Sequence, residues 1–219
     1  MSMLSAVEIE TAPNPSACVI WLHGLGANGH DFEPIIPELR LPTDTGIRFI
    51  FPHAPKKVVT INGGLRMPAW YDILSHDIER KVDVKQLLTS ADSVSQFIDR
   101  EIEKGIPSER IIIAGFSQGG AVGYELALTY PKPLGGLIAL STYFATKENI
   151  ECHIANKKLP IFIGHGTYDA IVPEVLGLQA NDLLIDKGYK PDYKTYPMDH
   201  SVCMEEVADI SKWLQIRLW

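Results

Sequence analysis

A serine lies between two glycines in the segment RIIIAGFSQGG, which covers residues 110–120. The apolar run before Ser117 predicts a buried strand and the residues after it predict a helix, so the serine is expected at a tight strand-to-helix turn. Glycines at positions 115 and 119 suit such a turn, because a Cβ atom there would collide with neighbouring backbone. This is the nucleophile elbow pattern, whose serine hydroxyl attacks acyl groups, whereas an ordinary turn needs the glycines but no serine.

A serine hydroxyl is a weak nucleophile until a base takes its proton, and the usual base is a histidine oriented by a carboxylate. In proteins with a nucleophile elbow, the catalytic residues follow one another along the chain in the order serine, acid, histidine. Among the histidines after Ser117, His200 lies in a loop just before the last predicted helix, where it can reach over the edge of a sheet. His165 directly follows a predicted strand with no carboxylate before it in the required order, and we interpret it as structural.

The acid of such a site should follow the strand that precedes the histidine loop. Asp169, in HGTYDAIVP, has this position. Asp199 is the alternative because it is next to His200, but adjacent side chains of an extended segment point to opposite sides. Asp192 is interpreted as a turn residue before a strand. The predicted catalytic residues are therefore Ser117, Asp169 and His200.

The segment WLHGLGANGH, residues 21–30, has the G-x-G-x-x-G spacing of a dinucleotide-binding turn. That interpretation needs an acidic residue at the end of the next strand, which here ends in FPH. A glycine-flanked turn also suits an oxyanion-binding loop, in which the backbone N–H of Leu25 points into the site. The second donor is expected from Gln118, the residue after the nucleophile. The sequence thus predicts an oxyanion hole made of Leu25 and Gln118, and no cofactor or metal.

These residues need a scaffold that brings distant segments to one edge of a sheet. Apolar runs rich in β-branched residues predict buried parallel strands over residues 17–23, 47–51, 110–116, 136–141 and 160–164. An apolar stripe from Val84 to Ile102 predicts a helix that Gly105 and Pro107 end, and an amphipathic pattern from Met204 to Leu218 predicts the last helix. The alternation of strands and helices indicates an α/β sheet covered on both faces.

Three further segments affect the expected site. Residues 7–11 predict a strand that forms an edge hairpin with the strand from residue 17. Residues 56–82 are the long irregular stretch, and long loops of compact domains are often functional. Trp70 in this stretch is either a packed anchor of the loop or a substrate contact. Only a short polar stretch separates the strands ending near 141 and starting at 160, which predicts no lid and an open groove over Ser117.

Length and composition limit the class of protein. The 219 residues are 46% hydrophobic and 21% charged, which indicates one globular domain over residues 1–219. A net charge of −7 opposes nucleic-acid binding. Because the N-terminus lacks a basic signal region and the apolar runs are too short to cross a bilayer, we expect a cytoplasmic protein that is not an integral membrane protein. Three cysteines without C-x-x-C spacing argue against a disulfide framework and a zinc site.

Taken together, these segments resemble the carboxylesterase and acyl-protein thioesterase family of small serine hydrolases. The resemblance runs nearly end to end, through WLHGLGANGHDF, IRFIFPHAP, MPAWYDI, GFSQGG, GGLIALSTY, HGTYDAIVP and YPMDHSV. It implies an α/β-hydrolase fold, the same three catalytic residues and the same two oxyanion donors. It also implies that lysophospholipids and S-acylated proteins are candidate substrates beside small-molecule esters.

Asp199 departs from the family pattern, which usually has glycine before the catalytic histidine. Aspartate tolerates a left-handed backbone better than most residues do, and its charge is expected to favour the imidazolium form of His200 and raise the pH needed for activity. A catalytically silent binding protein with the hydrolase fold is the alternative function. A dienelactone-type hydrolase would need a cysteine at position 117, and Cys203 cannot replace it. Ester or thioester preference, acyl length and a homodimeric state stay open.

Overall fold

The computed structural model describes residues 3–75 and 80–219. Its main sheet has seven strands in the order β1-β3-β2-β6-β7-β8-β9 and is parallel except for the pair of β1 with β3. The strands are β1 (Ala6–Glu10), β2 (Ala17–Leu22), β3 (Ile47–Pro52), β6 (Ile111–Phe116), β7 (Gly136–Leu140), β8 (Ile161–Gly166) and β9 (Asp192–Tyr196). The predicted parallel strands are confirmed, with ends that differ by one or two residues.

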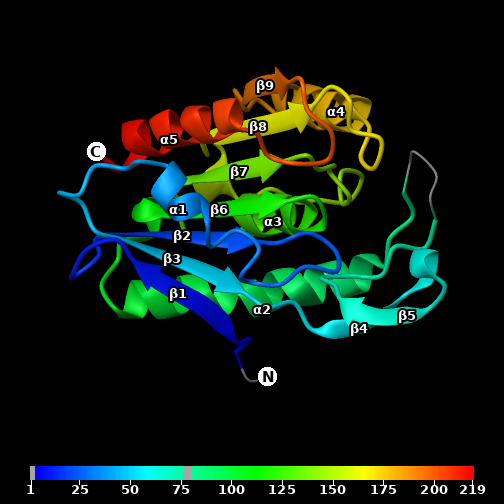
Figure 1. The fold of residues 1–219 in the computed structure, drawn as a ribbon, viewed down its shortest axis with the longest axis horizontal. Coiled ribbons are helices and arrows are strands. Elements are labelled where there is room, and N and C mark those ends of the chain that lie inside the picture. The colour runs from blue at the N-terminus through cyan, green and yellow to red at the C-terminus, as the bar shows by residue number, and fades with distance from the viewer. Residues whose placement is uncertain (1–2, 76–79) are drawn as a thin grey trace.

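Helices cover both faces of this sheet (Figure 1). On one face lie α2 (Val84–Glu103), α3 (Gln118–Thr129) and α4 (Glu174–Asp186). On the other face lie α1 (Ile35–Glu38) and α5 (Met204–Leu218). The side chain of Asp83 caps α2 by accepting a hydrogen bond from the backbone N–H of Gln86, and Gly105 follows the helix with a left-handed φ of 96°. Both ends of the predicted long helix are thus explained by local sequence.

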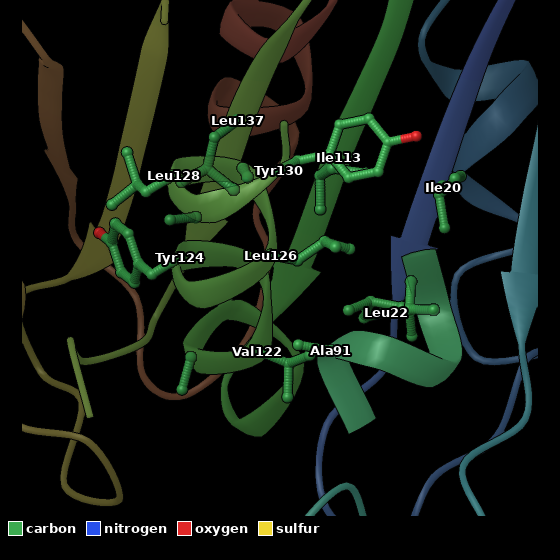
Figure 2. Close-up of a cluster of buried hydrophobic side chains, with 14 of the residues drawn as sticks. Ile20, Leu22, Ala91, Ile113, Val122, Tyr124, Leu126, Leu128, Tyr130 and Leu137 are labelled. Carbon is green, nitrogen blue, oxygen red and sulfur yellow. The ribbon is translucent and has the colours of Figure 1, made fainter. Parts of the chain in front are cut away.

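The core between the sheet and α3 fixes the helix that follows Ser117. Figure 2 shows Val122 and Leu126 of α3 among side chains from β2, β6 and α2. Every residue of α3 from Gln118 to Leu128 is buried. Because burial of one Val or Leu side chain contributes roughly 1.5–3 kcal/mol, the position of this helix is strongly determined.

The predicted hairpin of residues 7–11 with the strand from residue 17 is wrong. β1 lies at the edge of the sheet, as expected, but it pairs with β3, so that Val7 is opposite Phe51. β2 is occupied on both sides by parallel neighbours, β3 and β6. Arg48 of β3 strengthens the observed arrangement through ion pairs with Glu10 of β1 and the buried Glu101 of α2.

The stretch 56–82, predicted as irregular, contains a second small sheet. β4 (Lys56–Val59) and β5 (Leu65–Pro68) form an antiparallel hairpin through the 3-10 turn η1 (Thr60–Asn62). Gly63 and Gly64 follow that turn with φ of 66° and 77°, a backbone that favours glycine. In Figure 1 the hairpin lies beyond the arrowheads of β2 and β3. Residues 76–79 of the stretch lie outside the described residues.

The segment between β7 and β8 contains only the 3-10 turn η3 (Ile154–Asn156) as regular structure, which agrees with the predicted lack of a lid. The remaining short element is η2 (Ser108–Arg110), just before β6. Within residues 3–75 and 80–219, no helix combines the length and the apolar character needed to cross a membrane.

Candidate active site

Ser117 lies at the predicted turn between β6 and α3, with φ 52° and ψ −120°. A left-handed φ is unfavourable for serine, so the surrounding contacts must hold it. The Ser117 N–H donates to Leu140 O at 2.9 Å. A Cβ atom on Gly115 would lie 2.5 Å from the carbonyl of Gly119, and one on Gly119 would lie 2.5 Å from Leu22 O. The glycines flanking the serine are therefore required by close backbone approach, as the sequence predicted.

His200 connects the other two predicted residues. Its Nε2 lies 2.9 Å from Ser117 Oγ, and its Nδ1 lies 2.6 Å from Asp169 Oδ2. Asp169 follows β8 and His200 follows β9. Because β6, β7, β8 and β9 are neighbours in the sheet, both residues lie at the carboxyl ends of these strands, as Ser117 does. A carboxylate only accepts, so Nδ1 carries the proton and Nε2 is free to accept from the serine hydroxyl.

Asp169 is 6% exposed and is surrounded by donors. Its Oδ1 accepts the backbone N–H groups of Ile171 at 2.9 Å and Val172 at 2.7 Å. Burial alone would raise the pKa of Asp169, but the hydrogen bonds from His200 and these two N–H groups outweigh it and lower the pKa. The carboxyl group that faces His200 is thus ionised.

His165 does not reach Ser117. Its buried ring donates from Nε2 to Val172 O at 2.8 Å and lies 3.8 Å from Asp169 Oδ2. Burial lowers the pKa of His165, so the ring is neutral. These contacts agree with its interpretation as a structural residue.

Neither of the two other acids considered for the site is the hydrogen-bond partner of His200, whose Nδ1 bonds Asp169. Asp192 is the first residue of β9 and not a turn residue, and its Oδ2 accepts from Trp213 Nε1 at 3.1 Å. Asp199 is exposed, and it is not among the residues with a left-handed backbone, so tolerance of that conformation is not what places aspartate there.

Leu25 and Gln118 face one cavity together with Ser117 and His200. Gly26 follows Leu25 with a φ of 81°, which only glycine adopts readily. In the hydrogen bonding of the described residues, neither the Leu25 N–H nor the Gln118 N–H donates to a backbone carbonyl. Gln118 begins α3, where N–H groups have no partner within the helix. Two backbone donors are therefore available beside the serine.

The cavity has a volume of about 470 Å³, within the range of small-molecule sites. Part of its wall comes from the stretch 56–82, through Ile61, Ile73 and Arg80. Arg80 lies over the ring of Tyr143, 5.3 Å from its centroid, and donates to Ile171 O. Sequence reasoning did not find these wall residues, because their approach to Ser117 depends on contacts between distant segments.

Trp70 is an anchor and not a substrate contact. It is 0% exposed and does not line the cavity. Its indole Nε1–H donates to His23 O at 2.8 Å, directly before the glycine loop. The structure thus decides between the two interpretations that the sequence left open.

Comparisons with known proteins agree with this fold. The model of the phospholipase/carboxylesterase family matches residues 5–218. Acyl-protein thioesterase 1 of Neurospora crassa is 41% identical over 214 residues, which cover 93% of this chain and 87% of the relative. Acyl-protein thioesterase 1 of Saccharomyces cerevisiae is 37% identical over 206 residues, 90% of this chain and 91% of the relative.

Solved structures show the same fold. The crystal structure of Arabidopsis thaliana SOBER1 matches with a TM-score of 0.86 at 32% identity, covering 93% of this chain and 99% of that one. Acyl-protein thioesterase 2 of Zea mays matches with a TM-score of 0.83 at 26% identity, covering 98% of this chain and 100% of that one. The chain has the α/β-hydrolase fold, belongs to the phospholipase/carboxylesterase family and is a hydrolase of esters or thioesters.

Proposed function

We propose that the chain is a serine hydrolase that cleaves carboxylic esters or thioesters through an acyl-enzyme on Ser117. The observation that supports this most directly is the position of His200, which is hydrogen-bonded to both Ser117 Oγ and Asp169 Oδ2. This geometry lets one imidazole take the serine proton while the carboxylate holds its tautomer.

The proposed reaction has two stages. Ser117 Oγ attacks the acyl carbon as His200 Nε2 takes its proton, and the carbonyl oxygen becomes an oxyanion that accepts the N–H groups of Leu25 and Gln118. The intermediate then expels the alcohol or thiol, which receives the proton from His200. A water molecule, activated by the same imidazole, attacks the acyl-enzyme, and its collapse releases the carboxylic acid and restores the serine hydroxyl.

The cavity supports an apolar acyl group as part of the substrate. Leu25, Ile61, Ile73, Phe116 and Ile171 contribute apolar side chains to its wall. The curated relatives reported above carry the name acyl-protein thioesterase, which favours an acyl chain on a bulky leaving group. We propose S-acylated proteins and lipid esters such as lysophospholipids as the substrate classes.

The test is hydrolysis of p-nitrophenyl esters from acetate to palmitate and of S-acylated peptides, with the rate of Ser117→Ala subtracted at each length. We expect Ser117→Ala to lower kcat/KM by roughly 10⁴-fold or more and to block labelling by a fluorophosphonate. Rates that rise with chain length support long-chain substrates, whereas a maximum at short chains indicates a carboxylesterase of small esters. A wild-type chain that takes no label and cleaves no ester would overturn the proposal and favour a silent binding protein.

A further inference from the structure

The two proposed oxyanion donors belong to segments far apart in the sequence, and one of them lies in a glycine-rich loop. Donors of this kind act only when they are held in place before the reaction, because the loss of one typically costs roughly a hundredfold to a thousandfold in rate. A loop with glycines on both sides of Leu25 has no intrinsic preference for one conformation. Another part of the molecule must hold it.

Residues 68–70 form hydrogen bonds with this loop on both sides of Leu25. Before it, the indole Nε1–H of Trp70 donates to His23 O at 2.8 Å. After it, the backbone N–H of Gly26 donates to Pro68 O at 2.9 Å. The first of these bonds joins fully buried residues, where a hydrogen bond is directional and costly to break. The position of the Leu25 N–H is therefore tied to residues 68–70, at the end of β5 and just after it.

The same segment also holds the second donor, through the side chain of Gln118. Its Oε1 accepts the backbone N–H of Trp70 at 2.7 Å, and its Nε2 donates to Tyr71 O at 2.7 Å. The amide thus pairs with the backbone of residues 70 and 71 much as a neighbouring strand would. Ser90 Oγ of α2 donates to Trp70 O and fixes the segment from its other side.

We propose that Trp70 is a positioning residue of the oxyanion hole, which sets the separation of the Leu25 and Gln118 N–H groups without touching substrate. The proposal rests on the oxyanion role given to these two groups under the proposed function. Trp70 reaches both donors by hydrogen bonds of its own: the indole holds the loop of Leu25, and the backbone N–H holds the side chain of Gln118. A simple packing role would require neither bond.

The test is Trp70→Phe, which removes the indole N–H and keeps an aromatic ring. We expect kcat for a p-nitrophenyl ester to fall roughly tenfold to a hundredfold with KM nearly unchanged, because misplacement by about 1 Å can cost a hundredfold. Trp213→Phe is the matched control, since its indole N–H bonds Asp192 on the opposite face of the sheet and its loss should leave kcat at the wild-type value. Equal kcat in the two variants would overturn the proposal.

A pair of ligands separates positioning from a general loss of structure. A trifluoromethyl ketone with an alkyl chain adds to Ser117 Oγ, and its oxygen becomes an oxyanion, whereas the matching methyl ketone fills the cavity without forming the adduct. Trp70→Phe should weaken inhibition by the trifluoromethyl ketone in proportion to its loss of kcat/KM and leave binding of the methyl ketone unchanged. Equal weakening of both ligands would mean that the cavity itself is disturbed and would contradict the proposal.

A second variant keeps the proposal testable if Trp70→Phe does not fold. Gln118→Leu removes the side-chain bonds to residues 70 and 71 but keeps the backbone N–H, so it should give the same separation of kcat from KM. If Trp70→Phe does not fold, wild-type kcat in Gln118→Leu would overturn the proposal. If it folds, the double variant should lose little more than the larger single loss, because both changes release the same segment. Independent, additive losses would overturn the proposal. An inactive and unlabelled wild type would instead refute the proposed function.

Discussion

Two buried carboxyl groups lie beside strand β8. Asp169 belongs to the candidate active site, and Glu206 comes from α5, which packs on one face of the sheet. Asp169, after the strand, is 6% exposed and accepts three hydrogen bonds. Glu206, in the first turn of α5, is 0% exposed and packs against Gly164, where a Cβ atom would collide with its carboxyl group. Among the described residues, neither oxygen of Glu206 has a hydrogen-bond partner.

The difference in donors reverses the effect of burial on the two groups. Burial raises the pKa of each, but the donors around Asp169 bring its pKa below the ordinary value. For Glu206, burial and the nearby charge of Asp209 raise the pKa to about 8. Depth of burial alone therefore does not decide the charge of a carboxyl group, and donors placed by the backbone do.

The largest effect is expected from removing the charge of Asp169, the carboxyl group that accepts hydrogen bonds. Asp169→Asn keeps the shape, but its amide can donate to His200 Nδ1 and favour the wrong tautomer, so kcat should fall roughly 10³-fold to 10⁴-fold. Hydrolysis of a p-nitrophenyl ester above neutral pH measures this loss. Glu206→Gln is the matched control, because it changes a carboxyl of similar burial that makes no contact with the proposed reaction. A loss below about tenfold in Asp169→Asn would contradict the role proposed for Asp169.

The second largest effect is expected on stability. It comes from Glu206, whose carboxyl group has no hydrogen-bond partner among the described residues. In the unfolded chain Glu206 has a pKa near 4.5, whereas the native protein retains its proton up to about pH 8. Between these values the native state binds one more proton, so the free energy of unfolding should fall as pH rises. Since one pKa unit corresponds to about 1.4 kcal/mol, the fall is on the order of 4 kcal/mol.

Urea unfolding at about pH 5 and about pH 8 measures this change, with Glu206→Gln as the comparison because glutamine stays neutral throughout. The variant should lose less stability than the wild type over this interval, and the difference between them isolates Glu206 from other titrating groups. Parallel pH dependence in the two proteins would mean that Glu206 finds partners when it ionises.

The site of Asp169 could be predicted from sequence, but the environment of Glu206 could not. Ser117, Asp169 and His200 each follow a strand, and strands and their ends are encoded locally by apolar runs and turn residues. Glu206 follows Glu205 in the first turn of an amphipathic helix, where acidic residues usually face solvent. Its burial depends on Gly164, a residue of a different segment.

Contacts between distant segments also explain the other differences between the sequence-based predictions and the structure. Proximity in sequence favours a hairpin of β1 with β2, whereas both sides of β2 are paired with parallel neighbours, β3 and β6. The sequence does not predict the β4–β5 hairpin, because its strands are short and carry Lys, Arg and Pro, which are uncommon in buried strands. The wall formed by Ile61, Ile73 and Arg80 followed from neither pattern, since it depends on where this hairpin docks.

The smallest effect is expected from a third carboxyl, which is next to His200 but exposed. The charge of Asp199 adds to that of Asp169 in stabilising the positive charge that His200 gains when it takes the serine proton. Water and salt weaken an exposed charge, and we therefore expect Asp199→Gly to lower kcat/KM for a p-nitrophenyl ester by only about twofold. Asp199→Asn should give the same small loss, because it removes the charge without freeing the backbone. Wild-type kcat/KM in both variants would show that the charge does not reach the imidazole, and a loss above about tenfold would mean that exposure does not weaken it as the contrast with Asp169 requires.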